Sequence, residues 1–336
     1  MTLTARENTQ RILAFDHPER VMRDPPFHWL AYRGANHEGY DGGGHDLPVG
    51  SVWVDVWGTQ WHRSHEGVMG FPRACALNTP DKLRDYRWPD PDDERICGPI
   101  HAGAKAFPGG DVFLAGSHRN TLWEKIYQIV GMENAMEYFF TEPAFMREVL
   151  HRIMDFQLAL ARHYLQAGIE FAMFTDDLGT QQGPLLGPDL VREFFVPEYR
   201  RLTSFYKEKG VRIWFHSCGA IEWMIPTFID LGVDILNPVQ ATANDRERVR
   251  RATQGRLTLH GGVPNDLVLK GPLAAIRAEV QRTLWQLGRE GGYFCAPDQH
   301  MPFPREHEEA FAQAVNEFGC YPLLADGRRC GTLPGL

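Results

Sequence analysis

The chain has 336 residues, of which 43% are hydrophobic and 23% are charged, and its formal net charge is -8 at pH 7. This length and composition suit a sizeable hydrophobic core, and the acidic balance without a basic stripe argues against nucleic-acid binding. No stretch reaches the roughly 18 apolar residues of a membrane span, and residues 1–7 lack the apolar core of a signal peptide. We therefore predict neither a membrane nor a nucleic-acid partner and, by default, a cytoplasmic location. The oligomeric state stays open, a homodimer included.

The N-terminal region combines one clear helix with irregular chain. Thr4 and Glu7 have the spacing of a capping box, which predicts that a helix begins there. Residues 23–50 are rich in Gly, Pro, His and Asp and predict a long loop of the kind that forms lids or binding segments. Residues 52–56 can form an early strand.

From about residue 110, apolar strands alternate with helical patterns. The predicted strands are 112–115, 171–174, 211–215, 233–236, 257–260 and 292–296. The predicted helices are 121–131, 133–140, 143–167, 187–209, 220–231, 245–252, 272–288 and 305–318. Near-continuous apolar strands between helices indicate a parallel sheet that is buried on both faces.

With the early strand there are about seven or eight strand–helix units, which fits an α/β fold of the (β/α)8 TIM barrel type. A doubly wound sheet is the alternative, although no Gly-x-Gly-x-x-Gly follows a first strand to support a dinucleotide-binding version. We expect a single domain over residues 1–336, with an N-terminal extension at 1–50 and a C-terminal tail at 320–336.

A His-x-Cys pair lies at the end of one predicted strand. Because side chains alternate along a strand, His216 and Cys218 point the same way, roughly 7 Å apart. A neutral imidazole and a thiolate are ligands that suit Zn²⁺. Cys295, at the end of another apolar run, is a third candidate ligand. Three protein ligands with an open fourth position are typical of a catalytic zinc site.

Other polar side chains also follow predicted strands, where catalytic groups of a barrel lie. Asp176 and Asp177 are candidates for acid–base catalysis or for orienting a ligand. Alternation sends one of them into the barrel mouth and the other away, and helix capping is the competing explanation. His260, before two glycines, is a third catalytic candidate, with a hydrogen-bonded core histidine as the alternative.

Five residues are candidates for binding the substrate. His118 follows the strand at 112–115 and could contact an anionic group, with a surface loop as the competing explanation. Asn237 and Gln240 are neutral and are expected to position either the substrate or the neighbouring backbone. Trp57 and Trp61 could line a pocket for an aromatic substrate, with burial in the core as the competing explanation.

Four segments carry a further signal. They are residues 175–179, 215–221, 231–240 and 291–300. Together they resemble the uroporphyrinogen decarboxylase superfamily, and the likeness spans about residues 110–318. Decarboxylases of that superfamily carry an Arg-rich N-terminal segment, which this sequence does not contain. Residues 33–36 are a poor substitute for it, because their surroundings are rich in Gly and His.

The other branch of the superfamily contains zinc-dependent corrinoid and coenzyme M methyltransferases, which use His-x-Cys and a distant Cys as zinc ligands. His216, Cys218 and Cys295 resemble that pattern, with His300 as an alternative third ligand. The resemblance implies a zinc-containing methyltransferase, such as a demethylase. It would move a methyl group between a methylated small molecule (O-, S- or N-methyl, methoxy-aromatics included) and a thiol or a cobalamin carried by a corrinoid partner protein.

Two other functions stay open. One is a metal-free decarboxylase that acts on a tetrapyrrole or another carboxylate. The other is a protein of the same fold that binds a corrinoid or tetrapyrrole without catalysis.

Overall fold

The computed structural model describes residues 3–44, 47–66, 70–253 and 255–325. Residues 326–336 of the expected C-terminal tail therefore lie outside the described residues. None of the helices within those ranges combines the length and apolar character needed to cross a membrane.

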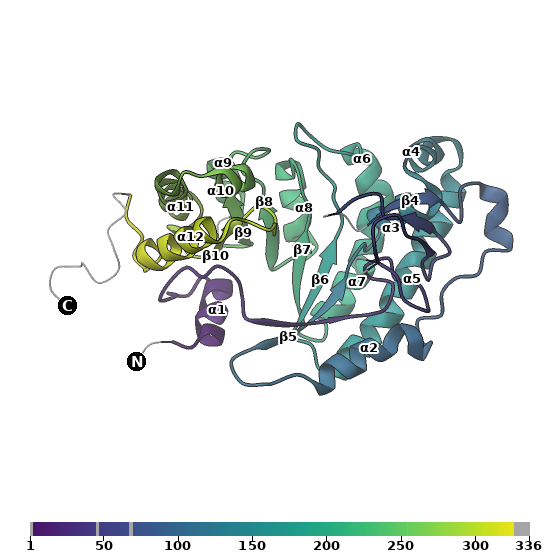
Figure 1. Ribbon diagram of the computed structural model, residues 1–336, viewed down its shortest axis with the longest axis horizontal. Helices are drawn as coiled ribbons and strands as arrows, with labels where there is room; N and C mark the ends of the chain where they lie inside the picture. The colour runs from purple at the N-terminus through teal and green to yellow at the C-terminus, as the bar shows by residue number, and fades with distance from the viewer. Residues whose placement is uncertain (1–2, 45–46, 67–69, 254, 326–336) are drawn as a thin grey trace.

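A curved parallel sheet of seven strands forms the centre of the molecule (Figure 1). In spatial order its strands are β1 (Phe27–Ala31), β5 (Phe113–His118), β6 (Phe171–Thr175), β7 (Arg212–His216), β8 (Ile235–Val239), β9 (Thr258–Val263) and β10 (Tyr293–Pro297). Each pair of neighbours is parallel. Consecutive parallel strands with helical connections confirm the predicted α/β, TIM-barrel-like architecture.

The segment before β1 lies along β10, the edge strand opposite β1. Met22 forms a parallel bridge with Phe294 of β10, and the Cys295 N–H donates to the Met22 carbonyl over 2.8 Å. Because β1 and β10 are the two edge strands, this segment joins the first strand to the last. The chain thus curls toward a closed barrel, with its eighth position held by a short irregular segment.

Helices surround the sheet (Figure 1). They are α2 (Glu94–Lys105), α3 (Trp123–Val130), α4 (Met132–Thr141), α5 (Pro143–Ala167), α6 (Pro188–Leu190), α7 (Val196–Lys207), α8 (Ile225–Asp230), α9 (Arg246–Thr253), α10 (Asn265–Lys270), α11 (Leu273–Gly288) and α12 (Arg305–Phe318). Short 3-10 turns cover Pro80–Arg84 and Glu222–Met224, and a π-helical turn joins α6 to α7 at Val191–Phe195. The outward side chains of the strands pack against these helices in the larger of two hydrophobic clusters.

Helix α1 (Ala5–Ala14) covers the N-terminal end of the barrel. The capping box predicted for Thr4 and Glu7 is confirmed. Ile12 and Leu13 pack into the barrel interior against inward side chains such as Phe171. With this end filled by apolar side chains, polar groups collect at the opposite end, where the strands finish.

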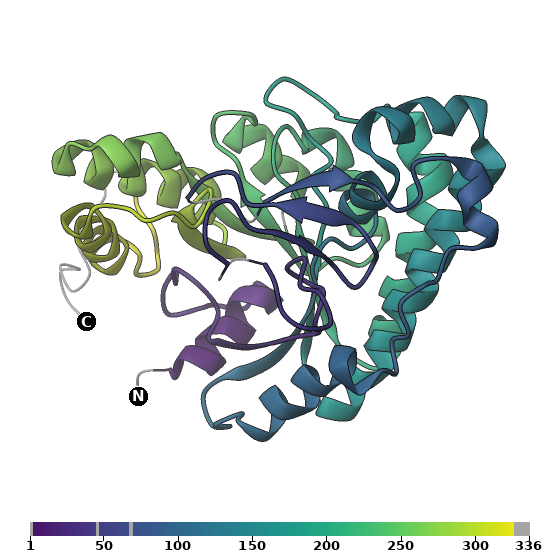
Figure 2. The same ribbon diagram turned by 45° about the vertical axis from the view of Figure 1, so that its right-hand side comes forward.

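Two predictions for the N-terminal region were wrong. Residues 23–50 are not one loop, because β1 lies within them, hidden in the sequence by the Gly- and His-rich chain that follows. The strand predicted at 52–56 does not join the barrel. It forms β2 (Val52–Val54) of a small antiparallel sheet with β3 (Gln60–His62) and β4 (Phe71–Ala74). Hydrogen bonds from Thr59 and Leu77 hold this sheet beside α3 (Figure 2).

Candidate functional site

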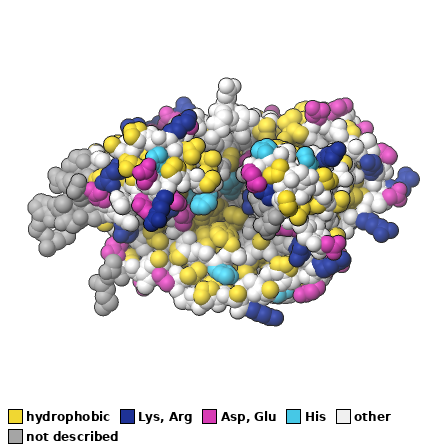
Figure 3. All heavy atoms as spheres, in the orientation of Figure 1, with side chains coloured by type: hydrophobic (Ala, Val, Ile, Leu, Met, Phe, Trp, Pro, Cys, Tyr) yellow, Lys and Arg dark blue, Asp and Glu magenta, His cyan; other side chains and the backbone are white. Residues whose placement is uncertain are grey.

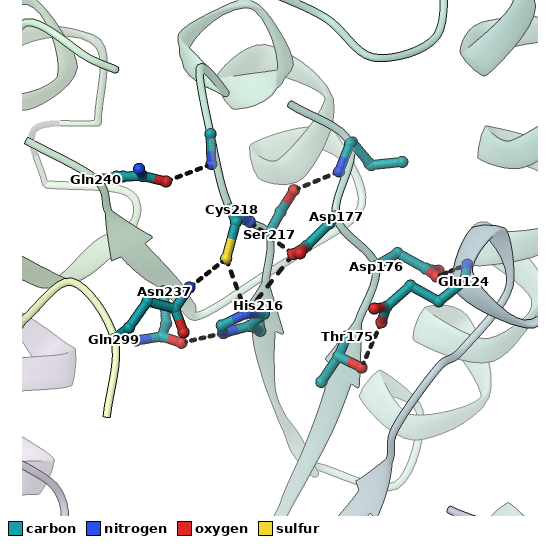
Figure 4. Close-up of polar contacts among 12 residues, drawn as sticks. Glu124, Thr175, Asp176, Asp177, His216, Ser217, Cys218, Asn237, Gln240 and Gln299 are labelled. Atoms are coloured by element: carbon teal, nitrogen blue, oxygen red, sulfur yellow. Dashed lines mark hydrogen bonds and ion pairs between the residues drawn. The ribbon is translucent and has the colours of Figure 1, made fainter. Parts of the chain in front are cut away.

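Asp177, His216 and Cys218 converge where β6 and β7 end (Figure 4). Strand alternation explains why: Trp214 faces the barrel interior and Phe215 faces the helices, so His216 and Cys218 share the interior side. The Cys218 Sγ lies 3.3 Å from the His216 Nε2, closer than an ideal strand would bring two such side chains. The predicted same-side pairing of these two residues is therefore present in the structure.

Asp177 completes a group of three potential metal ligands. Its Oδ1 lies 3.7 Å from the His216 Nε2 and accepts a hydrogen bond of 2.9 Å from the Cys218 N–H. One ligand atom from each of the three residues lies within 4.8 Å of the others. Carboxylate, imidazole and thiolate are all ligands of zinc. The described chain thus offers a mixed O, N and S donor set on the interior side of two adjacent strands.

A chain of hydrogen bonds runs from His216 to the surface. The His216 Nδ1 lies 2.5 Å from the Asn237 Oδ1, and the Asn237 Nδ2 lies 2.5 Å from the His260 Nδ1. The His260 Nε2 in turn lies 2.8 Å from the Asp24 Oδ1. Because an amide oxygen only accepts, His216 donates from Nδ1 and keeps its Nε2 lone pair for Cys218 and Asp177. A partner on the second ring nitrogen is what orients a metal-binding histidine.

The burial of the cluster disfavours its charged forms. Burial, and then the Asp177 carboxylate, raises the pKa of the Cys218 thiol well above its usual range. Burial also lowers the pKa of His216, against the opposing influence of Asp177. Without a cation the cluster therefore holds a neutral imidazole and a protonated thiol. A divalent cation would reverse the preference of the thiol, because metal binding releases its proton.

Backbone and amide groups hold the loop that carries Cys218. Gly219 has a φ of +81°, and a Cβ there would lie 2.4 Å from the Gly179 carbonyl, so the two loops pack backbone to backbone. The Gln240 Oε1 accepts a 2.8 Å hydrogen bond from the Gly219 N–H. Gln240, predicted to bind substrate, thus fixes the loop, and the Gln299 amide donates to the Cys218 Sγ. No feature of the sequence singled out Gln299.

Asp176 points away from Asp177, as the alternation predicted. Its carboxylate accepts hydrogen bonds from the backbone N–H groups of Leu122 (2.9 Å) and Glu124 (2.8 Å) at the start of α3, and from the Tyr199 hydroxyl (2.6 Å). Burial raises the pKa of Asp176 to about 7. Asp176 thus caps the N-terminus of α3 and holds this helix against β6, in agreement with the capping explanation given for it above.

Glu124 is an acidic group that the sequence did not reveal. Burial, and then the charges of Asp177 and Asp176, raises the pKa of Glu124 well above its usual range. The Thr175 hydroxyl donates to its Oε2 over 3.1 Å. In Figure 4, Glu124 lies on the α3 side of the Asp177–His216–Cys218 cluster. A buried carboxyl group whose protonated form is favoured by its surroundings therefore lies near the candidate ligands.

The structure does not bring Cys295 to the cluster. On β10, Phe294 packs in the barrel interior, whereas Cys295 is fully buried in the outer layer between strands and helices. A residue one position away from an interior residue faces outward, so the candidate third thiol lies on the wrong side of its strand. His300, the alternative, is exposed and lines a neighbouring pocket, and neither residue joins the described ligand group.

That pocket, of about 220 Å³, adjoins the cluster. His216, Asn237 and His260 line one part of it, and its other lining residues include Arg23, Asp24, Gln299, His300, Phe303 and Phe311. The face seen in Figure 1 is hollowed near its middle, where hydrophobic and histidine side chains lie side by side (Figure 3). A small molecule in this pocket would contact His216 directly. His260 lines it while its ring nitrogens are engaged by Asn237 and Asp24.

Three predicted substrate-binding residues lie elsewhere. Trp57 is fully buried, with its ring against Phe156. Trp61 is also buried and donates from Nε1 to the Asp55 carboxylate over 2.8 Å. His118 faces the helices and is held between the Gln157 amide and the Tyr206 hydroxyl. Both tryptophans are therefore buried in the core, which is the competing explanation given for them above. His118 lies on the outer side of β5 because Ala115, three positions earlier, faces the interior.

His118 predicts a measurable pH dependence of stability. Burial lowers its pKa from 6.5 to about 4, so the unfolded chain binds a proton more readily than the folded one between these values. Its contribution to stability is fully present above pH 6.5 and is lost as the pH falls through 4, by roughly 3 kcal/mol in total. We expect the free energy of unfolding of His118→Asn, measured with denaturant, to fall less steeply with decreasing pH than that of the wild type. Parallel pH profiles would contradict this.

One solved structure shares the fold of this chain over most of its length. The chain is similar to a solved structure described as a methyltransferase from Methanosarcina mazei, with a TM-score of 0.67 and 17% identity, covering 94% of this chain and 99% of that one. It is also similar to a B12-independent methionine synthase from Shewanella sp. W3-18-1, solved in complex with selenomethionine. There the TM-score is 0.43 and the identity 10%, covering 65% of this chain and 63% of that one. No curated protein matches the sequence.

A family model supplies the classification. Residues 112–318 match the model described as uroporphyrinogen decarboxylase (URO-D). The match begins just before β5 and ends with α12, so it contains Asp177, His216 and Cys218. Because it spans more than half of the chain, the protein belongs to the uroporphyrinogen decarboxylase family.

Proposed function

We propose that this protein is a zinc-dependent methyltransferase of the uroporphyrinogen decarboxylase family. The observation that carries the proposal is the cluster of Asp177, His216 and Cys218, in which Asn237 leaves the His216 Nε2 free to bind a metal. The cluster lies at the carboxyl ends of parallel strands, where barrel enzymes place their reactive groups. The likeness to a solved methyltransferase supports the same fold, and the function rests on the cluster.

The donor set fits zinc. His216, Cys218 and Asp177 would hold the ion, and the adjoining pocket leaves room for a further ligand from the substrate. Zinc bound there would supply Lewis acidity, which favours a thiolate near neutral pH or the departure of an oxygen from its methyl group. Cys295 and His300, considered as third ligands from the sequence, are replaced in this proposal by Asp177.

The remaining groups position the reactants and manage protons. In methyl transfer, the acceptor supplies an electron pair to the methyl carbon, and the bond to the donor heteroatom breaks with its electron pair. When the donor is an O-, S- or N-methyl group, the departing heteroatom takes up a proton, and when a thiol is the acceptor, it gives up its proton. We assign Glu124, whose pKa is raised by burial and by the charges of Asp177 and Asp176, as the group that exchanges this proton. His216, Asn237 and His260 line the pocket for the small molecule. The second reactant is a thiol, or a cobalamin that a corrinoid partner protein brings to the mouth.

Metal removal tests the proposal. We expect the chelator-treated protein to lose methyl transfer between methylcobalamin and a panel of thiols, or between methoxy-aromatic donors and reduced cobalamin, and added Zn²⁺ to restore it. Magnesium is the matched control ion, because a Cys- and His-containing site discriminates against it. The proposal fails if transfer is unaffected by the chelator, or if the metal-free protein turns over uroporphyrinogen instead.

A further inference from the structure

We propose a second zinc site, formed by Cys97, His101 and His163 on the outer side of the barrel. These three residues are the other group, among those the structure describes, whose ligand atoms all lie within 4.8 Å of one another. Cys97 and His101 come from α2, and His163 comes from α5, so the site joins two helices that pack together. It has no residue in common with the cluster at the strand ends.

Helical spacing places two of the ligands. Cys97 and His101 are four positions apart, so their side chains lie one turn apart on the same face of α2. That face packs against α5, where the His163 Nδ1 lies 3.1 Å from the His101 Nε2. Two nitrogens of a tetrahedral zinc site, each about 2.0–2.1 Å from the ion, are separated by a similar distance. The imidazoles are therefore already close to the spacing that a shared ion requires.

Asp92 sets the proton on His163. The His163 Nε2 lies 2.8 Å from the Asp92 Oδ1, and an ionised carboxylate only accepts, so Nε2 carries the hydrogen and Nδ1 keeps a lone pair for His101 and Cys97. A carboxylate on the second nitrogen is the arrangement that orients and strengthens a zinc-binding histidine. The Cys97 thiol lies 3.7 Å from the Asp92 carbonyl, so the same residue also positions the third ligand.

Solvent reaches the site, and its neighbourhood is acidic. Residues 90–94 contain three aspartates and a glutamate before and at the start of α2, which favours a cation there. The Asp92 side chain is 77% exposed and that of His163 is 15% exposed, whereas Cys97 is buried. An ion could thus enter past His163 and be held against a buried sulfur. With three protein ligands, one position stays for water.

Elemental analysis of the full chain tests this site apart from the proposed catalytic one. The protein is stripped with a chelator, reloaded with Zn²⁺ and freed of excess ion. We expect about two zinc ions per chain in the wild type and about one in Cys97→Ser, His163→Gln and Cys218→Ala. Cys75→Ala, which removes a free cysteine outside both groups, is the matched control and keeps both ions. Combining Cys97→Ser with Cys218→Ala leaves none.

The outcomes separate the two sites. If the wild type holds one ion that is lost in Cys97→Ser but kept in Cys218→Ala, the result supports the outer zinc site and contradicts the proposed catalytic zinc site. If the one ion is lost only in Cys218→Ala, the outer site is overturned and the histidines are merely hydrogen-bonded to each other. His163→Gln keeps a side chain that can bond to Asp92, so it gives the answer if Cys97→Ser does not fold. Zn²⁺ should also raise the Tm of Cys218→Ala by roughly 5 °C but not that of the double variant.

Discussion

Replacing Cys218 by alanine is expected to weaken zinc binding at the strand-end cluster by more than about 100-fold and to abolish methyl transfer. Removal of an outer partner of a ligand costs 10- to 100-fold in metal affinity, and Cys218 is itself a proposed ligand. The fold should survive, because the side chain is small and only partly buried. Zinc affinity measured by competition with a chromogenic chelator, together with a thermal melt, checks both statements.

Cys295→Ala is the matched control for that experiment. Both substitutions remove one thiol, but Cys295 lies in the middle of β10 and faces the outer layer of the barrel. The variant should keep the zinc affinity of the wild type and lose a little stability through the small cavity left in the core. If both variants lost the ion alike, Cys295 would be a ligand and the side-chain directions described for β10 would be incorrect.

Asp176→Ala is expected to lower the free energy of unfolding by roughly 2–5 kcal/mol. The substitution leaves the backbone N–H groups of Leu122 and Glu124 and the Tyr199 hydroxyl without their acceptor, and each buried donor without a partner costs roughly 1–3 kcal/mol. Part of this is offset because the buried carboxylate is itself unfavourable when ionised. Urea unfolding followed by circular dichroism measures the difference.

The cost of Asp176→Ala should depend on pH in a defined direction. The folded protein raises the pKa of Asp176 from 3.8 to about 7, so the stabilising contribution of this group is fully present below 3.8 and is lost as the pH rises through 7. The loss in the variant should therefore be larger near pH 5 than near pH 8. Asp177→Ala is the matched neighbour: its side chain is 43% exposed, so we expect little loss of stability but weaker zinc binding. Equal stability losses in the two variants would contradict the assignment.

The sequence predicted most strands of the barrel and, within the candidate site, the pairing of His216 with Cys218. Apolar runs bounded by Gly, Pro and Asp predicted the strands after residue 110, because such runs must be buried on both faces of a parallel sheet. The pairing of His216 with Cys218 followed from alternation alone, because His216 ends β7 and Cys218 follows two positions later. Its prediction required no knowledge of other strands.

The rest depends on contacts that periodicity cannot specify. A continuous apolar run does not reveal which residues face inward, so the direction of Cys295 required the register of β10 against β9. Gln299 and Glu124 meet the cluster from segments far away in the chain, and neither has a local pattern that marks it. Long-range packing therefore decides the ligand set, even where local sequence decides the strands.

The segment around Met22 and Asp24 has a practical consequence for how this protein is divided into fragments. The family match begins at residue 112, yet Met22 pairs with β10, and Asp24 ends the hydrogen-bond chain that orients His216. A chain trimmed to residues 112–318 would lack β1 and the segment that joins it to the last strand. In such a fragment, His260 would lose its hydrogen bond to Asp24, and with it the outermost link of the chain that orients His216. All residues matched by the family model would still be present. Chimeras that exchange sequence between relatives should therefore carry the first 31 residues together with the barrel they close.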